Sequence, residues 1–405
     1  MKAISHDRRI KYIYFFRGDL TFGVHFFEAW ANAVRNEGVP MQLVTFLSYP
    51  KFIDQKHLVK YYKAKGIKVY LSIFHKHTIL LYFFMLCLLN KKIIVHLKKQ
   101  PAYVFDRLKL IFPNTLKYIV EGEGDPISEI DFLLKHPYKK DFYKKITDSV
   151  IDAVRDQQKY IRNADLLTVG TTYFKELLIK RYPNIDLRSK ISVVQMSFTK
   201  GSLSFSKNIR LKYRELLGFN NKFVIIYIGN AYYSWQNLYR TIQIAQLLDK
   251  IVEKPICLVL LIKEKDHPIV NNFIQELNYK GDYILKQVAH SEIINYLNSS
   301  DIGVALRHDH SMNKVASSGK ILEYLACGLP VMTTFGNGVE QPILVEKRGY
   351  GAVLKNMDDD SEIIEKIHPF IDYDHEKRNE MSNWANANLS TESFIGEYIS
   401  KLKKL

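Results

Sequence analysis

Short apolar runs rich in β-branched residues alternate with helical patterns along the whole chain of 405 residues. Since strands that alternate with helices form βαβ units, this order predicts an α/β fold with parallel sheets. The strand candidates of the first half are KYIYFF (11–16), MQLVTF (41–46), KVYLSIF (68–74), KIIVHL (92–97), KYIVEG (117–122), LLTVG (166–170) and ISVVQM (191–196). Those of the second half are FVIIYIG (223–229), ICLVLLI (256–262), DYILK (282–286), DIGVAL (301–306), PVMTT (330–334) and GAVL (351–354). Helices are expected at residues 26–37, 149–162, 238–252, 291–297 and 320–327.

A polar, serine-rich stretch without periodicity, SFTKGSLSFSKN, separates the two halves. It indicates a linker near residues 198–210. We therefore expect two α/β domains, at residues 1–200 and 205–385, with a ligand cleft between them. The tail 391–405 has the pattern of an amphipathic helix.

The net charge of +16 is carried by the first half of the chain. Residues 1–200 contain 34 Lys and Arg against 18 Asp and Glu, whereas the remainder contains 24 of each kind. Such an excess predicts a salt-sensitive attraction to an anionic surface. Because no nucleic-acid-binding motif accompanies the charge, a membrane surface is the expected partner and nucleic acid is not.

The strongest apolar run, ILLYFFMLCLL at residues 79–89, is too short to cross a bilayer as a helix, which needs ~20 residues. We expect a buried helix here, with shallow membrane contact as the alternative. No secretory signal is visible at the start of the chain. Cys87, Cys257 and Cys327 lie far apart in apolar runs, as reduced core thiols do. We therefore expect a cytoplasmic protein that is attached to the membrane at most peripherally.

The segment SSGKILEYLACGLPV, residues 317–331, predicts a short helix with an open start and a firm end. Gly328 suits a left-handed residue after the helix, and Pro330 prevents its continuation. The free N–H groups of the helix start and the charge of Lys320 suit a phosphate, while Glu323, one turn later, can accept hydrogen bonds from ribose hydroxyls. The segment fits a sugar nucleotide. A plain exposed Lys–Glu pair is the alternative.

With these motifs in this order, the chain resembles the GT-B glycosyltransferases, in particular the large retaining family 4. The resemblance covers most of residues 160–405 and is carried by FVIIYIG, SSGKILEYLACGLPV, GVEQPILVEKRGYGAVL and WANANLSTESFIGEYISKL. It implies two Rossmann-like domains facing across a cleft, with the acceptor bound at 1–200 and the donor at 205–385. The C-terminal helix, 386–405, would pack back on the first domain.

The resemblance also implies which residues bind the donor. Glu323 would hold the ribose, and Lys320 with the backbone of Ser318 and Gly319 would hold the diphosphate. Arg307 would add charge from a strand end facing this loop. The remaining donor-binding candidates are Gly18 and Gly23 in the first domain, and Gly229 and Asn230 in the second.

For catalysis, Arg307 and Lys320 would stabilise the departing diphosphate. His96 lies where relatives place an active-site histidine, although a structural histidine at a strand end fits equally. Glu121 and Glu123 follow the next strand and could orient an acceptor hydroxyl or act as base, with an exposed acidic turn as the alternative.

Two positions depart from the family pattern. Val315 stands where many relatives have a first glutamate, eight residues before Glu323. The loop at 230–237, which often carries Arg and Lys, has no positive charge here. Both departures bear on sugar contacts and leaving-group stabilisation more than on the fold.

Three clusters have a superficial resemblance to metal sites: the aspartates at 358–360 and the histidine pairs His75/His77 and His308/His310. None has neighbouring ligands that complete a coordination set, so we expect neither a metal nor a cofactor.

The sequence thus predicts a hexosyltransferase-type glycosyltransferase (EC 2.4) of polysaccharide, glycolipid or glycan biosynthesis. It would use a nucleotide sugar such as a UDP- or GDP-sugar, retain the anomeric configuration and need no metal. Two alternatives use the same fold. One is a non-catalytic protein that binds a nucleotide or a partner, favoured by the uncharged loop, and the other is a nucleotide-sugar epimerase.

Overall fold

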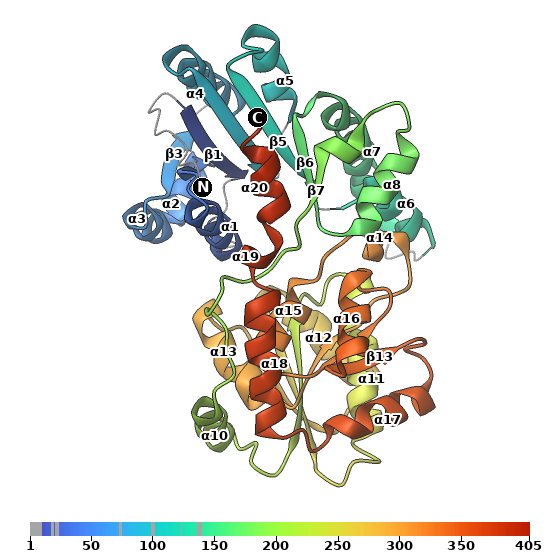
Figure 1. Cartoon of the computed structure of the whole chain (residues 1–405). Coiled ribbons are helices and arrows are strands. Elements are labelled where there is room, and N and C mark those ends of the chain that lie inside the picture. Colours follow the sequence, from blue (N-terminus) through green and yellow to red (C-terminus); the bar gives the residue numbers. More distant parts are fainter. Residues whose placement is uncertain are drawn as a thin grey trace. The chain divides into compact units, whose positions relative to one another are not determined.

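The computed structural model describes residues 10–17, 20, 24–72, 75–98, 102–122, 124–135 and 140–405. Gly18, Gly23 and Glu123, three of the predicted site residues, lie outside the described residues. The chain forms two compact units (Figure 1). The first unit comprises Met1–Gly170, Phe174–Gln195 and Thr391–Leu405, and the second comprises Thr171–Tyr173 and Met196–Ser390. The domain boundaries expected near residues 200–205 stay a prediction, because contacts do not show which stretches fold on their own.

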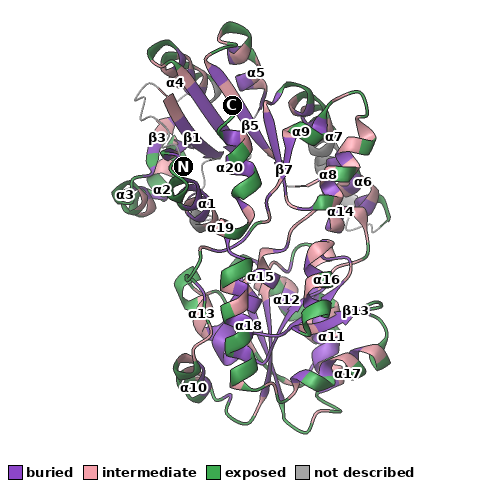
Figure 2. Cartoon of the chain, viewed as in Figure 1, coloured by how far each residue is buried: buried purple, intermediate pink, exposed green. Residues whose placement is uncertain are grey.

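The first unit is built on a sheet of seven parallel strands in the order β3-β2-β1-β4-β5-β6-β7. The strands are β1 (Ile10–Arg17), β2 (Met41–Ser48), β3 (Lys68–Ser72), β4 (Lys92–Lys98), β5 (Leu116–Gly122), β6 (Leu166–Val169) and β7 (Ile191–Val193). The helices are α1 (Val24–Asn36), α2 (Tyr49–Asp54), α3 (Lys56–Ala64), α4 (His75–Leu89), α5 (Ala102–Ile111), α6 (Pro126–Lys135), α7 (Lys140–Asn163), α8 (Thr172–Arg181), α9 (Leu187–Lys190), α19 (Thr391–Phe394) and α20 (Gly396–Leu402). Helices cover both faces of a parallel sheet, so its strands are mostly apolar and largely buried, as Figure 2 shows.

The second unit has a sheet of six parallel strands in the order β10-β9-β8-β11-β12-β13. Its strands are β8 (Phe223–Gly229), β9 (Ile256–Ile262), β10 (Asp282–Lys286), β11 (Ile302–Ala305), β12 (Val331–Thr334) and β13 (Gly351–Leu354). Its helices are α10 (Lys207–Leu216), η1 (Ser234–Gln236), α11 (Leu238–Leu248), η2 (Glu264–Asp266), α12 (His267–Glu276), α13 (His290–Ser299), α14 (Ser311–Lys314), α15 (Gly319–Ala326), α16 (Glu340–Arg348), α17 (Asp360–Ile367), η3 (His368–Phe370) and α18 (His375–Asn388). The predicted α/β fold with two parallel sheets is confirmed.

Three helices replace the single helix expected over 386–405. α18 ends at Asn388, and the short α19 and α20 follow it. The last break lies just before Gly396, and glycine is a poor helix former. Tyr398, Ile399 and Leu402 of α20 join the buried core of the first unit.

The expectation of a buried helix at residues 79–89 is only half right. Ile79, Phe83 and Cys87 recur at intervals of four residues and are buried. The opposite face of α4, which is equally apolar, is exposed. A uniformly apolar helix gives no periodic signal, so the sequence could not show which face meets the sheet. None of the described helices combines the length and the apolar character needed to cross a membrane.

Candidate functional site

The carboxyl ends of the neighbouring strands β8, β11 and β12 lie side by side at one end of the second unit's sheet. The chain runs from β8 outward to β9 and β10, then returns to place β11 on the other side of β8. In open α/β sheets such a reversal of strand order leaves a crevice, where ligands bind. Gly229 ends β8 and Arg307 follows β11, so the topology brings both residues to this point.

Helix α15 supplies the cation of the site, Lys320, and begins where the sequence predicts. Ser318 precedes the helix, and its N–H donates to Gln341 Oε1 over 3.0 Å. At the other end Gly328 is left-handed, with φ of +61°, and a Cβ there would lie 2.3 Å from the Arg378 carbonyl oxygen. The tight packing of this end fixes the register of α15 and hence the position of Lys320.

The Lys320 ammonium lies against the end of β8. Its Nζ donates to Gln236 Oε1 over 2.7 Å and lies 5.0 Å from the centroid of the Tyr227 ring. The Tyr227 hydroxyl lies 2.9 Å from both Gln236 Oε1 and the Asn230 carbonyl oxygen. A Cβ on Gly229 would lie 2.5 Å from Lys320 Nζ and 2.6 Å from Gln236 Oε1. Only glycine permits this approach of the lysine to the strand end.

Arg307 brings a second cation to the site. Its backbone N–H donates to Thr334 Oγ1 over 3.0 Å, which ties the loop after β11 to the end of β12. Arg307, Lys320, Ser318 and Asn337 line a small cavity of about 10 Å³. The Asn337 amide donates to the Ala305 carbonyl oxygen over 2.8 Å, while its buried Oδ1 has no partner among the described residues. The cavity therefore combines two cationic side chains with unused hydrogen-bonding capacity.

The electrostatics of the site favour an anionic ligand. Burial and the neighbouring Arg307 charge lower the pKa of Lys320 to about 7, although Glu323 opposes this shift. Burial likewise lowers the pKa of Arg307. Burial raises the pKa of Glu323 to about 7, against the effect of Lys320. The two cations have lost part of their hydration and repel each other. Binding of an anion therefore stabilises them more than it would stabilise exposed cations.

Glu323 lies on α15, one turn after Lys320. It is half-buried, and within the described part of the chain its carboxylate forms no hydrogen bond. A carboxylate in this position can accept hydrogen bonds from vicinal hydroxyls, as the sequence predicts. The α15 start, Lys320, Arg307 and Glu323 together can hold a phosphate and a sugar ring at once.

No protein-family model matches the chain, and no curated protein matches its sequence. Solved structures match over nearly its whole length. HepE from Anabaena, in complex with UDP and glucose, has a TM-score of 0.66 at 12% identity, covering 98% of this chain and 100% of that chain. A glycosyltransferase from Rickettsia africae has a TM-score of 0.60 at 14% identity, with 97% of each chain covered. WaaG, a glycosyltransferase involved in lipopolysaccharide biosynthesis, has a TM-score of 0.59 at 11% identity over 96% of this chain and 98% of that chain.

The chain has the GT-B fold. In this GT-B chain the predicted residues Gly229, Asn230, Arg307, Lys320 and Glu323 belong to the second unit, together with Ser318 and Gly319. The role of each as a donor ligand stays a prediction.

His96 and Glu121, the other catalytic candidates, lie together in the first unit of the GT-B fold. His96 on β4 is 0% exposed and stacks on Tyr14, with ring centroids 4.6 Å apart. Its Nδ1 lies 3.0 Å from the hydroxyl of Tyr398 on the C-terminal helix α20, and its Nε2 lies 3.4 Å from Glu121 Oε2. Burial lowers the pKa of His96. Because His96 is fully buried, its surroundings favour the structural role, which was one of the two roles expected from the sequence.

Glu121 accepts hydrogen bonds from Lys98 Nζ and, over 2.9 Å, from the Tyr14 hydroxyl. Burial opposes its ionisation, but the Lys98 charge and His96 outweigh burial and lower its pKa to about 2. A carboxylate so firmly ionised is a poor proton acceptor near neutral pH. Its catalytic role stays a prediction, and the ion pair with Lys98 accounts for its present position.

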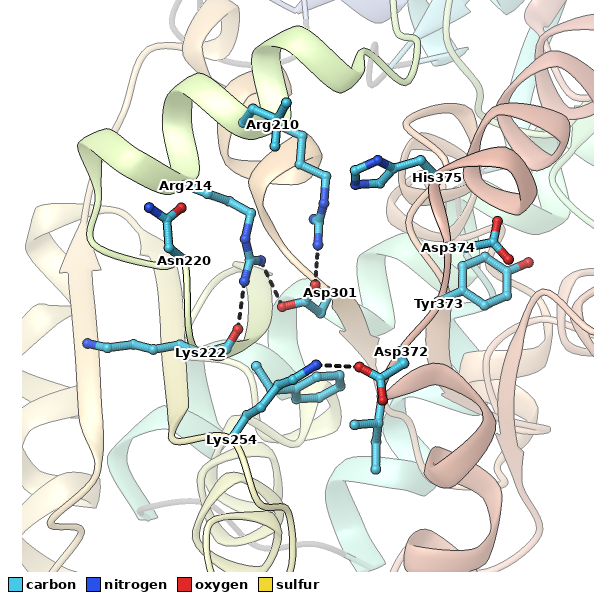
Figure 3. Close-up of a pocket in the computed structure, with 13 residues that line it drawn as sticks. Arg210, Arg214, Asn220, Lys222, Lys254, Asp301, Asp372, Tyr373, Asp374 and His375 are labelled. Atoms are coloured by element: carbon cyan, nitrogen blue, oxygen red, sulfur yellow. Dashed lines mark hydrogen bonds and ion pairs between the residues drawn. The ribbon is translucent and has the colours of Figure 1, made fainter.

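A second and larger cavity lies at the opposite, amino-terminal ends of the same strands, with a volume of about 460 Å³ (Figure 3). Arg210 and Arg214 of α10 form its wall and both pair with Asp301. Arg210 also donates to the Ser300 carbonyl oxygen over 2.6 Å, and Arg214 donates to that of Phe219 over 2.6 Å. Because these guanidinium groups are occupied by the protein itself, we assign them to anchoring α10.

Sequence reasoning missed Gln236 and Asn337, the amide side chains that contact Lys320 or line its cavity. Gln236 ends the three-residue helix η1 and Asn337 lies in the loop between β12 and α16, and neither segment has a periodicity that would mark it. The departure Val315 is buried at the end of α14 and contributes no polar side chain. Among the described residues no group of three or more His, Cys, Asp or Glu could hold a metal ion, and metal independence stays a prediction.

Proposed function

We propose that this protein is a glycosyltransferase that moves a sugar from a nucleoside-diphosphate sugar to a glycan, glycolipid or polysaccharide acceptor. The observation that carries the proposal is the pair of cations, Lys320 and Arg307, which line one cavity at the strand-order reversal of the second unit. Glu323 lies one turn after Lys320 on α15, and its carboxylate forms no hydrogen bond to the described residues. Such a set of groups matches the diphosphate and ribose of a nucleotide sugar. The GT-B fold supports the same reaction class.

In the reaction, the bond between the anomeric carbon and the diphosphate oxygen breaks, and the diphosphate keeps the electron pair. An acceptor hydroxyl forms the new bond to the anomeric carbon, and its proton passes to the departing diphosphate. Lys320, Arg307 and the N–H groups at the start of α15 would stabilise the charge that grows on the diphosphate. Glu323 would hold the ribose and so fix the distance of the anomeric carbon from these cations. Retention and independence of a metal are part of the proposal through the family resemblance.

The identity of the nucleotide draws support from the structures with the same fold. HepE was solved with UDP, with UDP and glucose, and with UDP-glucose. We therefore propose a UDP-sugar donor first, and a GDP-sugar second. WaaG acts in lipopolysaccharide biosynthesis, which supports a surface glycan or glycolipid as acceptor.

A non-catalytic nucleotide-binding protein is the second candidate. It is favoured by the segment between β8 and α11. There Gln236 accepts a hydrogen bond from the Lys320 ammonium, and no residue of the segment adds positive charge. A protein of this kind would bind a UDP-sugar at the same site without releasing UDP.

Calorimetric titration of the whole protein with UDP and GDP, followed by detection of nucleotide release from their sugar conjugates, tests both candidates. We expect Glu323→Ala to weaken UDP binding about 10- to 100-fold, because a carboxylate that accepts two hydroxyl groups contributes charge-assisted hydrogen bonds worth ~1.5–3 kcal/mol. Glu346→Ala, which removes an exposed carboxylate from α16, serves as the matched control and should bind UDP like the wild type.

Nucleotide release that depends on an added acceptor would establish the transferase. Binding without any release would favour the second candidate, and isomerised donor without transfer would indicate an epimerase. Unchanged UDP affinity in Glu323→Ala would show that Glu323 does not bind the ribose.

A further inference from the structure

Helix α4 of the first unit exposes an apolar stripe. Leu81, Met85, Leu88 and Leu89 fall within about 100° of arc on the helix and are between 46% and 71% exposed. The opposite stripe, described above, is buried against the unit. Because residues 78–90 contain no charged side chain, this exposed face has no charged group that would favour its hydration.

The end of helix α5 extends this surface. Leu110 is 84% exposed and Ile111 is 61% exposed. The rings of Phe84 on α4 and Phe112, just after α5, pack edge to face with centroids 5.3 Å apart. This contact joins the two exposed stretches. We call the exposed side chains of Leu81, Met85, Leu88, Leu89, Leu110 and Ile111 the α4–α5 apolar surface.

Cations border this surface. Lys91 lies two residues after the end of α4 and is exposed, and Arg107 is exposed on α5 three residues before Leu110, on the same side of the helix. The lysines at 109 and 117 pair with Asp165, so the protein itself partly neutralises their charge. Between Glu37 and Asp106 the sequence has eleven lysines and a single acidic residue, Asp54. The stretch of chain that includes α4 is thus strongly positive.

We propose that the α4–α5 apolar surface inserts into the interfacial region of an anionic lipid bilayer. Exposed leucine and isoleucine side chains bordered by lysine and arginine are the chemistry that binds both the acyl chains and the negative headgroups of such a membrane. A protein partner would have to supply carboxylates around an apolar patch, whereas an anionic bilayer presents both properties everywhere. The 15 residues of α4 span about 22 Å, less than the ~30 Å hydrocarbon core, so the helix lies along the membrane surface. The inference does not depend on the reaction proposed above.

Sedimentation of the whole protein with vesicles tests this surface. Two compositions are used: phosphatidylcholine alone, and phosphatidylcholine with about one third phosphatidylglycerol. We expect at least about tenfold stronger binding to the anionic vesicles, weakened by salt. The double variant Leu88→Glu/Leu110→Glu should reduce that binding about tenfold or more, since it places two carboxylates at the lipid contact. Arg107→Gln should reduce it about fivefold and make it less sensitive to salt.

Leu216→Glu is the matched control, because Leu216 is a 69% exposed leucine on α10 of the second unit. This variant should bind vesicles like the wild type, and circular dichroism should show all variants folded. A fluorescent nitrobenzoxadiazole probe on Leu88→Cys should shift to the blue with anionic vesicles, whereas the same probe on Leu216→Cys should not.

Wild-type binding by the Leu88→Glu/Leu110→Glu variant would overturn the proposal. Equal binding to both vesicle compositions would overturn the role of the anionic lipid. A wild-type dimer that binds no vesicles and dissociates in the double variant would show instead that a second copy covers this surface. UDP binding measured on the same samples keeps a failure here separate from a failure of the proposed reaction.

Discussion

Replacing Gly229 by alanine tests the arrangement of the candidate donor site with a single methyl group. The added Cβ would lie 2.5 Å from Lys320 Nζ, 2.6 Å from Gln236 Oε1 and 2.9 Å from the Tyr227 hydroxyl. Lys320 and Gln236 are flexible side chains that can rotate aside, whereas the Tyr227 ring is buried in the core of the second unit and has to shift by a smaller amount, so the fold persists. The change breaks the charge-assisted hydrogen bond from Lys320 to Gln236, which contributes ~1.5–3 kcal/mol. Both partners are half-buried and regain some water contacts, so we expect a loss of ~1–2 kcal/mol in stability.

For a unit of this size, a loss of 1 kcal/mol lowers Tm by ~2–4 °C. UDP affinity should fall about 10- to 100-fold, because Lys320 no longer points at the position proposed for the diphosphate. Differential scanning fluorimetry and calorimetric titration with UDP measure the two effects. Gly396→Ala is the control, since a Cβ there meets no atom within 4 Å. If Gly229→Ala kept both the Tm and the UDP affinity of the wild type, the close approach of Lys320 to β8 would have no bearing on donor binding.

Two further predictions concern charge in the second unit. An anionic diphosphate favours protonated Lys320, whose pKa in the free protein is lowered to about 7, so the UDP affinity of the wild type relative to Lys320→Arg should fall as the pH rises from about 7 to 9. The fall should approach about tenfold per pH unit in calorimetric titrations, and a constant ratio would contradict it. Asp301→Asn should lower the free energy of unfolding in urea by ~3–5 kcal/mol, because Arg210 and Arg214 would lose a buried counter-ion. An unchanged urea midpoint would show that the backbone carbonyl oxygens alone compensate these two guanidinium groups.

The sequence predicted the strands of both sheets well because a parallel sheet buries its strands as continuous apolar runs. β8 and β9 are examples in which nearly every residue is buried. The order of the strands is a different matter, since it depends on contacts between distant segments. The reversal between β8 and β11, which creates the candidate site, became visible only in the structure.

The candidate site itself was predicted in part. The glycine after α15 and the cation at its start follow local rules of helix ends, so Lys320 and Glu323 could be singled out from the sequence. Gln236, by contrast, obeys no local rule, and only the folded chain brings it to Lys320. The exposed stripe of α4 was hidden for a related reason: an all-apolar helix looks the same from every side.

The crystal structure of the protein with bound UDP tests the central claim most directly. We expect the ribose hydroxyls within hydrogen-bond distance of Glu323 and the diphosphate at the start of α15, beside Lys320 and Arg307. UDP found elsewhere, for instance in the cavity bounded by Arg210 and Arg214, would contradict this claim.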